Sequence, residues 1–141
     1  MIPEPNWQPI SALSMIANMI DGQLEDAQEQ YTRLLEAQPT PHILDDYTIH
    51  RTIQVYTDQL EFVPIYKTQL KKWQLEAHTT SIQQSEIKRL QEQMKKWENI
   101  LNSILHLASE LKEGTIENIL SKSDWELGIQ GLQKHNNSKR Y

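Results

Sequence analysis

The chain of 141 residues contains no cysteine, which excludes disulfides, thiolate metal sites and a cysteine nucleophile. Its four glycines do not form a P-loop or the glycine-rich turn of a dinucleotide-binding fold. No stretch approaches the roughly 18 apolar residues that a membrane-spanning helix needs. Because the first nine residues also lack basic residues and an apolar run, we expect a cytoplasmic protein without a membrane segment.

What the sequence does have is a spacing of apolar residues at alternating steps of three and four, which places them on one face of an α-helix. The spacing occurs three times: at Leu13, Ile16, Ile20, Leu24, Ala27, Tyr31 and Leu34; at Ile49, Ile53, Tyr56, Leu60 and Val63; and at Ile87, Leu90, Met94, Trp97, Leu101, Ile104, Ala108 and Leu111. No charged residue interrupts any of these apolar stripes. We therefore predict an all-α fold whose core offers no buried acid or metal ligand.

The ends of the first two helices are marked by proline and aspartate. Pro9 suits the first turn of a helix that runs to about Gln38. Asp45 or Asp46 can cap a second helix, which we expect to continue to about Ala77 as one helix kinked at Pro64.

The third helix has signals at both of its ends. Ser81 and Gln84 have the spacing of a capping box, in which a hydroxyl and an amide satisfy two backbone N–H groups. Gly114 follows the last residue of the apolar stripe and is placed to end the helix in a left-handed conformation.

Short connections force neighbouring helices to run antiparallel, so we predict an elongated up-down-up bundle with coiled-coil-like packing. Residues 1–132 form a single domain in this interpretation, beginning with an extended, proline-rich arm at residues 1–9. We expect Trp7 to anchor this arm, without a partner that the sequence identifies. A short C-terminal helical segment containing Trp125 follows the third long helix. The composition of residues 133–141 predicts a disordered tail.

The first helix carries more apolar residues than one packed face can bury. Ala12, Met15 and Met19 form a second apolar stripe beside the core stripe. Either a second copy of the chain covers it, or an intramolecular segment does, with the Trp7 arm and the segment around Trp125 as candidates. Our leading hypothesis is a non-enzymatic interaction or structural protein that self-associates as a homodimer, or binds a protein partner, through Ala12, Met15, Met19 and Trp125.

Charge is distributed unevenly along the chain. Residues 67–97 contain seven Lys or Arg against three Glu, whereas residues 21–61 contain nine acids against two Arg. The candidates for anion binding are Lys71, Lys72, Lys88, Arg89, Lys95 and Lys96. They could bind nucleic acid as an accessory protein or the acidic half of another subunit, or simply form a solvated face. The net charge of −5 argues against a general nucleic-acid binder.

Acidic pairs at helical spacing give an enzymatic alternative. Asp58, Glu61, Glu110 and Glu113 could hold Mg²⁺ against a phosphorylated substrate, as in all-helical nucleotide pyrophosphohydrolases. Metal-assisted catalysis needs carboxylates that converge in a dry cavity, and Asp58 points away from the apolar stripe. The five histidines show no paired metal-ligand spacing, although His42, His50 and His106 could share one end of the bundle. We therefore expect no cofactor and no resident metal.

Overall fold

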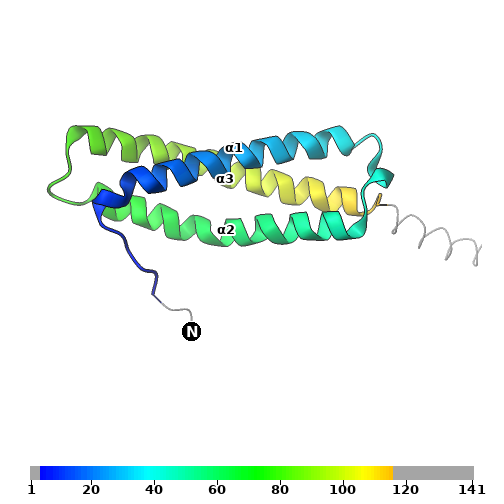
Figure 1. Cartoon of the computed structure of the whole chain (residues 1–141), viewed down its shortest axis with the longest axis horizontal. Coiled ribbons are helices and arrows are strands. Elements are labelled where there is room, and N and C mark those ends of the chain that lie inside the picture. The colour runs from blue at the N-terminus through cyan, green and yellow to red at the C-terminus, as the bar shows by residue number, and fades with distance from the viewer. Residues whose placement is uncertain (1–3, 116–141) are drawn as a thin grey trace, which may run out of the picture.

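The computed structural model describes residues 4–115, and these residues form an elongated bundle of α-helices without strands. The helices are α1 (Leu13–Ala37), α2 (Asp46–Gln74) and α3 (Ser81–Lys112), with single 3-10 turns at η1 (Ile10–Ala12) and η2 (Pro41–Ile43). Successive helices run in opposite directions (Figure 1). The predicted all-α, up-down-up fold is confirmed. The C-terminal segment, Trp125 and the tail at 133–141 lie outside the described residues, as do the first three residues of the arm.

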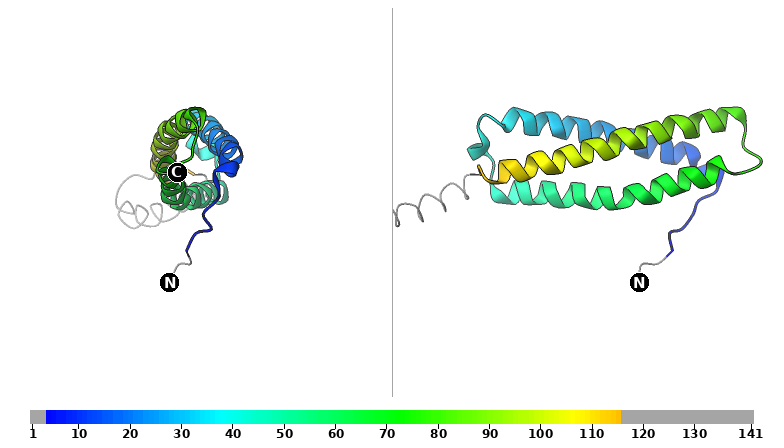
Figure 2. Two further views of the ribbon diagram at one scale, coloured as in Figure 1. Left: turned by 90° about the vertical axis from the view of Figure 1, so that its left-hand side faces the viewer. Right: turned by 180° about the vertical axis from the view of Figure 1, so that it is seen from behind.

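The helix α3 is the central element of the bundle. It packs along both α1 and α2, whereas α1 and α2 approach each other far less closely (Figure 2). Its apolar stripe is buried from end to end, as the spacing predicted. The two largest fully buried side chains are Trp97 of α3 and Trp73 of α2. Since each fully buried large apolar side chain contributes about 1.5–3 kcal/mol, this stripe is the main source of stability.

Both long helices that follow a connection begin at a side-chain cap. The carboxylate of Asp45 accepts from the backbone N–H of Thr48 at 2.7 Å, and hydrogen bonding to the side chain and the backbone of Thr48 lowers the pKa of Asp45. The capping box of α3 is formed by Thr80 and Gln83, one residue earlier than predicted. Gln84 instead donates its amide to the hydroxyl of Thr79 across the connection, which leaves the capping role to the preceding pair.

The helix α2 passes through Pro64 as one continuous helix, as expected. Thr68 lies one turn after Pro64, and its hydroxyl donates to the carbonyl of Pro64. The helix ends at Gln74 rather than at Ala77, because the N–H of Glu76 bonds to the carbonyl of Trp73 in a tight turn. Ala77 is exposed, so it adds nothing to the buried face of α2. No helix among the described residues is long and apolar enough to cross a membrane.

The far end of the bundle is closed by contacts between the chain after α3 and the turn before α2. Gly114 does not adopt the predicted left-handed conformation. Its position needs glycine for a different reason, because a Cβ atom there would lie 2.6 Å from Cγ of Pro41. Thr115 is fully buried beside it and donates its hydroxyl to the carboxylate of Asp46 at 2.7 Å.

Replacing Gly114 by alanine should therefore destabilise the bundle. The methyl group would force Pro41 or the α3 terminus to move, at a cost of about 1–3 kcal/mol. Gly22→Ala is the matched control: Gly22 lies inside α1, where an added Cβ would have no neighbour within 4 Å, so that change should stabilise the fold by about 0.5–1 kcal/mol. Urea unfolding of both variants measures the two effects, and equal shifts would contradict the close approach to Pro41.

Candidate interaction surface

The second apolar stripe of α1 is only partly covered by the bundle. Met15 is 61% exposed, whereas Ala12 and Met19 are half-buried and pack against the edge of the core. The stripe therefore protrudes chiefly through one methionine. Ala12 and Met19 add partly exposed apolar surface beside this methionine.

The neighbouring part of α2 adds aromatic side chains that the sequence did not single out. Phe62 is 52% exposed, and its ring centroid lies 6.5 Å from that of the half-buried Tyr66. Tyr66 in turn packs on Trp97, with centroids 6.0 Å apart. An aromatic chain thus leads from the core of α3 to the surface of α2. Phe62 lies next to the predicted core stripe and not on it. A phenylalanine in such a position is the sequence signal that could have identified this part of the surface.

These residues of α1 and α2 occupy the same face. Gln30 of α1 lines one shallow surface pocket with Arg51 and Tyr56 of α2, so these parts of the two helices lie close together. At the other end of the helices Gln8, just before α1, contacts Gln69 of α2. In this antiparallel register Met19 is level with Phe62 and Tyr66, within about one turn.

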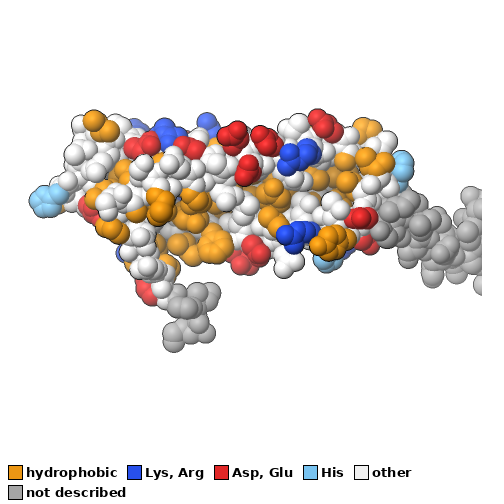
Figure 3. All heavy atoms as spheres, in the orientation of Figure 1, with side chains coloured by type: hydrophobic (Ala, Val, Ile, Leu, Met, Phe, Trp, Pro, Cys, Tyr) orange, Lys and Arg blue, Asp and Glu red, His pale blue; other side chains and the backbone are white. Residues whose placement is uncertain are grey.

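We define the α1/α2 face as the surface formed by Ala12, Met15, Met19, Phe62 and Tyr66. Apolar side chains gather along the band between the two helices in Figure 3, the side on which α1 and α2 do not close against each other. Charged residues occur farther along the same helices, with Asp26 and Arg33 on α1 and Arg51 and Asp58 on α2. These four residues carry two charges of each sign.

The arm at residues 4–9 lies on α2 rather than over Met15. Trp7 is half-buried and the ammonium of Lys72 lies 4.9 Å from its ring centroid. The backbone of Gln8 is bound by the side chains of Gln69 and Trp73. Trp7 therefore anchors the arm, as the sequence predicted, and the structure identifies α2 as its partner. Met15 nevertheless keeps most of its surface exposed, so the described part of the arm does not cover it.

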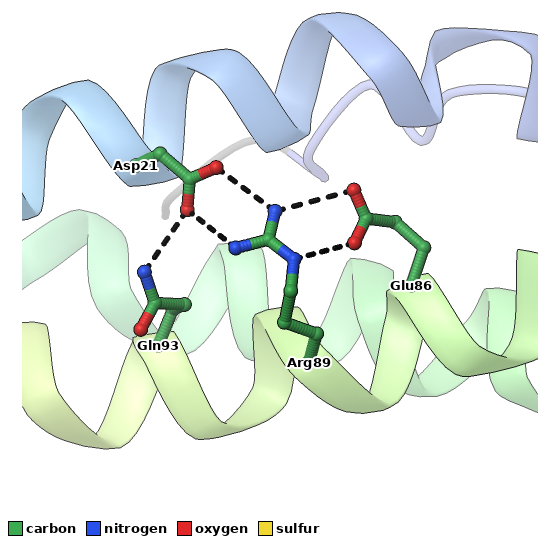
Figure 4. A network of polar contacts seen from close by, with 4 residues as sticks. All are labelled: Asp21, Glu86, Arg89 and Gln93. Atoms are coloured by element: carbon green, nitrogen blue, oxygen red, sulfur yellow. Dashed lines mark hydrogen bonds and ion pairs between the residues drawn. The ribbon is translucent and has the colours of Figure 1, made fainter.

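The six candidate anion-binding residues do not form one cluster. Arg89 points toward α1, where it binds both carboxylate oxygens of Asp21 at 3.0 and 2.8 Å (Figure 4). Glu86 binds the same guanidinium, and Gln93 donates to Asp21 at 3.1 Å. This network joins α1 to α3. Hydrogen bonds from Arg89 lower the pKa of Asp21, against an opposing effect of burial.

The lysines are divided between different sides of the bundle. Lys72 faces the arm. Lys71 and Lys88 lie one turn from Gln74 and Gln84, whose hydrogen bond joins α2 to α3. Lys95 is paired with Glu92 at 3.2 Å. The nearby Lys67 is paired with Glu98, and Lys96 is exposed on α3. The basic charge is thus partly neutralised and spread around the molecule.

The four candidate catalytic acids are exposed and lie in two separate places. Asp58 and Glu61 are near the level of Trp97, which donates its indole N–H to Gln59 at 3.3 Å. Glu110 and Glu113 lie more than three turns farther along α3, about 20 Å away. Glu110 is paired with His106 at 3.1 Å. The described residues contain no group of three or more His, Asp or Glu that could hold a metal ion.

Comparison of the chain with protein-family models, with curated proteins and with solved structures found no match.

The network around Arg89 predicts a specific dependence of stability on pH. Because the pKa of Asp21 is lowered in the folded state, its contribution is complete above its unfolded value near 3.8 and is lost as the pH falls through the folded value. Asp21→Asn should cost about 0.5–1 kcal/mol at pH 7, as expected for an exposed bidentate pair. The difference from the unmodified protein should shrink as the pH is lowered from 5 to about 2.

Thermal unfolding across this pH range measures the effect. Asp58→Asn is a suitable control, since Asp58 is exposed and has no ion pair among the described residues. A stability difference for Asp21→Asn that stays constant with pH would contradict the assignment.

Proposed function

We propose that the protein is a non-enzymatic interaction module that self-associates through its α1/α2 face. The observation that carries the proposal is the joint exposure of Met15 and Phe62 on the side of the bundle where α1 and α2 do not pack together. An exposed band of apolar side chains, such as the one between α1 and α2 in Figure 3, is typical of protein contacts. Methionine and aromatic residues are also enriched at the centres of interfaces.

A second copy of the chain suits this face because its charges are balanced. A twofold contact places the same surface on both sides of the interface. Asp26 and Asp58 then meet a surface that also offers Arg33 and Arg51, so neither sign is forced against itself. The half-buried Met19 and Tyr66 extend the apolar area toward the core.

The expected association is modest in strength. Full burial of Met15 and Phe62 contributes about 1.5–3 kcal/mol for each side chain. This gain is opposed by the loss of translational and rotational freedom, which costs several kcal/mol or more. We therefore propose a dimer whose population rises with protein concentration.

The alternative functions receive less support from the geometry. The separation of Asp58 and Glu61 from Glu110 and Glu113 does not favour a Mg²⁺-dependent pyrophosphohydrolase. The division of Lys71, Lys72 and Arg89 between three sides does not favour a nucleic-acid accessory protein, which would present its basic groups along one surface.

Replacing both Met15 and Phe62 by glutamate should abolish the dimer. Both side chains are more than half exposed, so the change should leave the helical content intact while placing four like charges in a twofold contact. Sedimentation equilibrium over a wide concentration range measures the solution mass, and circular dichroism checks the fold.

The control is Ile43→Glu, which makes the same kind of change at an apolar residue that is 68% exposed in η2, away from the α1/α2 face. It should leave the dimer unaffected. A strictly monomeric unmodified protein, or a double variant that still dimerises, would contradict the proposal.

A further inference from the structure

The described arm, residues 4–9, contacts α2 through one compact set of side chains. The backbone N–H of Gln8 donates to Oε1 of Gln69 at 2.6 Å, and its carbonyl accepts from Nε1 of Trp73 at 3.0 Å. Lys72, between these two residues in the chain, lies over the ring of Trp7. We call Gln69, Lys72 and Trp73 the arm-binding site.

The arm-binding site recognises an extended segment mainly through its backbone. Both main-chain groups of Gln8 are bound, while its side chain turns back to the carbonyl of Asn6. Pro9 follows with φ −70° and ψ 161°, an extended conformation that proline favours. The chemistry of the site therefore fits an extended peptide that carries an aromatic residue next to the backbone-bound residue.

The bound arm shields polar groups of the site from water. With the arm in place, Gln69 is only 5% exposed and Trp73 is fully buried, and the amide oxygen and the indole N–H are both hydrogen-bonded to Gln8. A segment that replaces the arm must offer the same backbone groups, because a segment that covered the site without them would bury both polar groups without partners, at a cost of about 1–3 kcal/mol for each group.

We infer that the arm-binding site is an intermolecular recognition site, in which residues 4–9 of one copy bind α2 of a second copy. This inference rests on the self-association proposed above. Outside the arm itself, the polar and aromatic contacts of residues 4–8 are all made with α2, and the link to α1 is the turn at Pro9. An identical arm from a second copy offers identical groups, so exchange preserves every one of these contacts.

The positions of the two surfaces make the exchange possible. Met15 lies six residues after Pro9, and Phe62 lies seven residues before Gln69, so the α1/α2 face begins within about 10 Å of the arm-binding site along each helix. In Figure 1 the arm runs from the start of α1 past the C-terminal end of α2. Its six residues span up to about 20 Å when extended, and packed helices lie about 8–10 Å apart. An arm can therefore reach from one copy to another that is seated on Met15 and Phe62.

Cross-linking between single-cysteine variants tests this inference, because the native chain has no cysteine. One variant carries Asn6→Cys in the arm and the other carries Thr68→Cys, one turn before Lys72 on α2; both positions are exposed. The two full-length proteins are unfolded, mixed, refolded together and treated with a short bis-maleimide reagent. Exchange predicts a covalent species of twice the chain mass in the mixture, well above its level in either variant alone.

A matched mixture replaces Thr68→Cys by Gln54→Cys, an exposed position on α2 about 20 Å from residue 68. It should give no covalent dimer. A chain carrying both Asn6→Cys and Thr68→Cys shows whether the arm stays on its own α2, because it then cross-links internally at the mass of one chain.

The solution mass of the same samples separates the two proposals. A dimeric mass with only internal cross-links would overturn arm exchange and leave self-association standing. A monomeric mass with only internal cross-links would overturn both.

Discussion

The structure depends on the uninterrupted apolar stripe of α3. Each turn of this helix presents a buried side chain, from Ile87 near its start to Leu111 near its end, so α1 and α2 both obtain their core by packing on it. Because a single helix serves two neighbours, those neighbours do not need to close against each other. The open α1/α2 face is a direct consequence of the same packing that stabilises the fold.

The sequence predicted this arrangement well because it follows from periodicity and proline alone. The three stripes, the antiparallel order and the passage of α2 through Pro64 needed no knowledge of long-range contacts. Details that depend on contacts were less accurate. The position of Gly114 in the sequence predicts a left-handed cap, whereas the structure requires glycine there because Pro41, which is distant in the chain, lies against it. The observed capping box lies one residue before the predicted one. Thr80 and Ser81 are chemically similar, and only the geometry of the connection selects between them.

Only part of the α1/α2 face could be predicted from the sequence, because the rest depends on contacts between residues that are distant in the chain. Met15 could be recognised as surplus on α1, but Phe62 is an isolated aromatic residue whose importance comes from lying beside Tyr66 on the same face. For the basic residues, the sequence predicted a cluster that the structure does not form. Lys72 and Arg89 are level in an antiparallel hairpin, yet one faces the arm and the other faces α1. Position along a helix is readable from spacing, whereas the partner on each side depends on which helix lies there.

Gln69 links the arm to the core of the bundle. A glutamine on the inner part of a packed helix is costly unless its amide is hydrogen-bonded, and a leucine at this position would pack without that requirement. Its buried oxygen accepts from a backbone N–H of the arm, as Trp73 donates to a carbonyl of the same residue. Polar groups that bind a backbone in this way fix where a segment sits but leave open which copy supplies it. In the arm exchange that we infer, the choice between a chain's own arm and that of a neighbour depends on the backbone conformation at Pro9 and on whether the α1/α2 face is covered, which would couple the two surfaces.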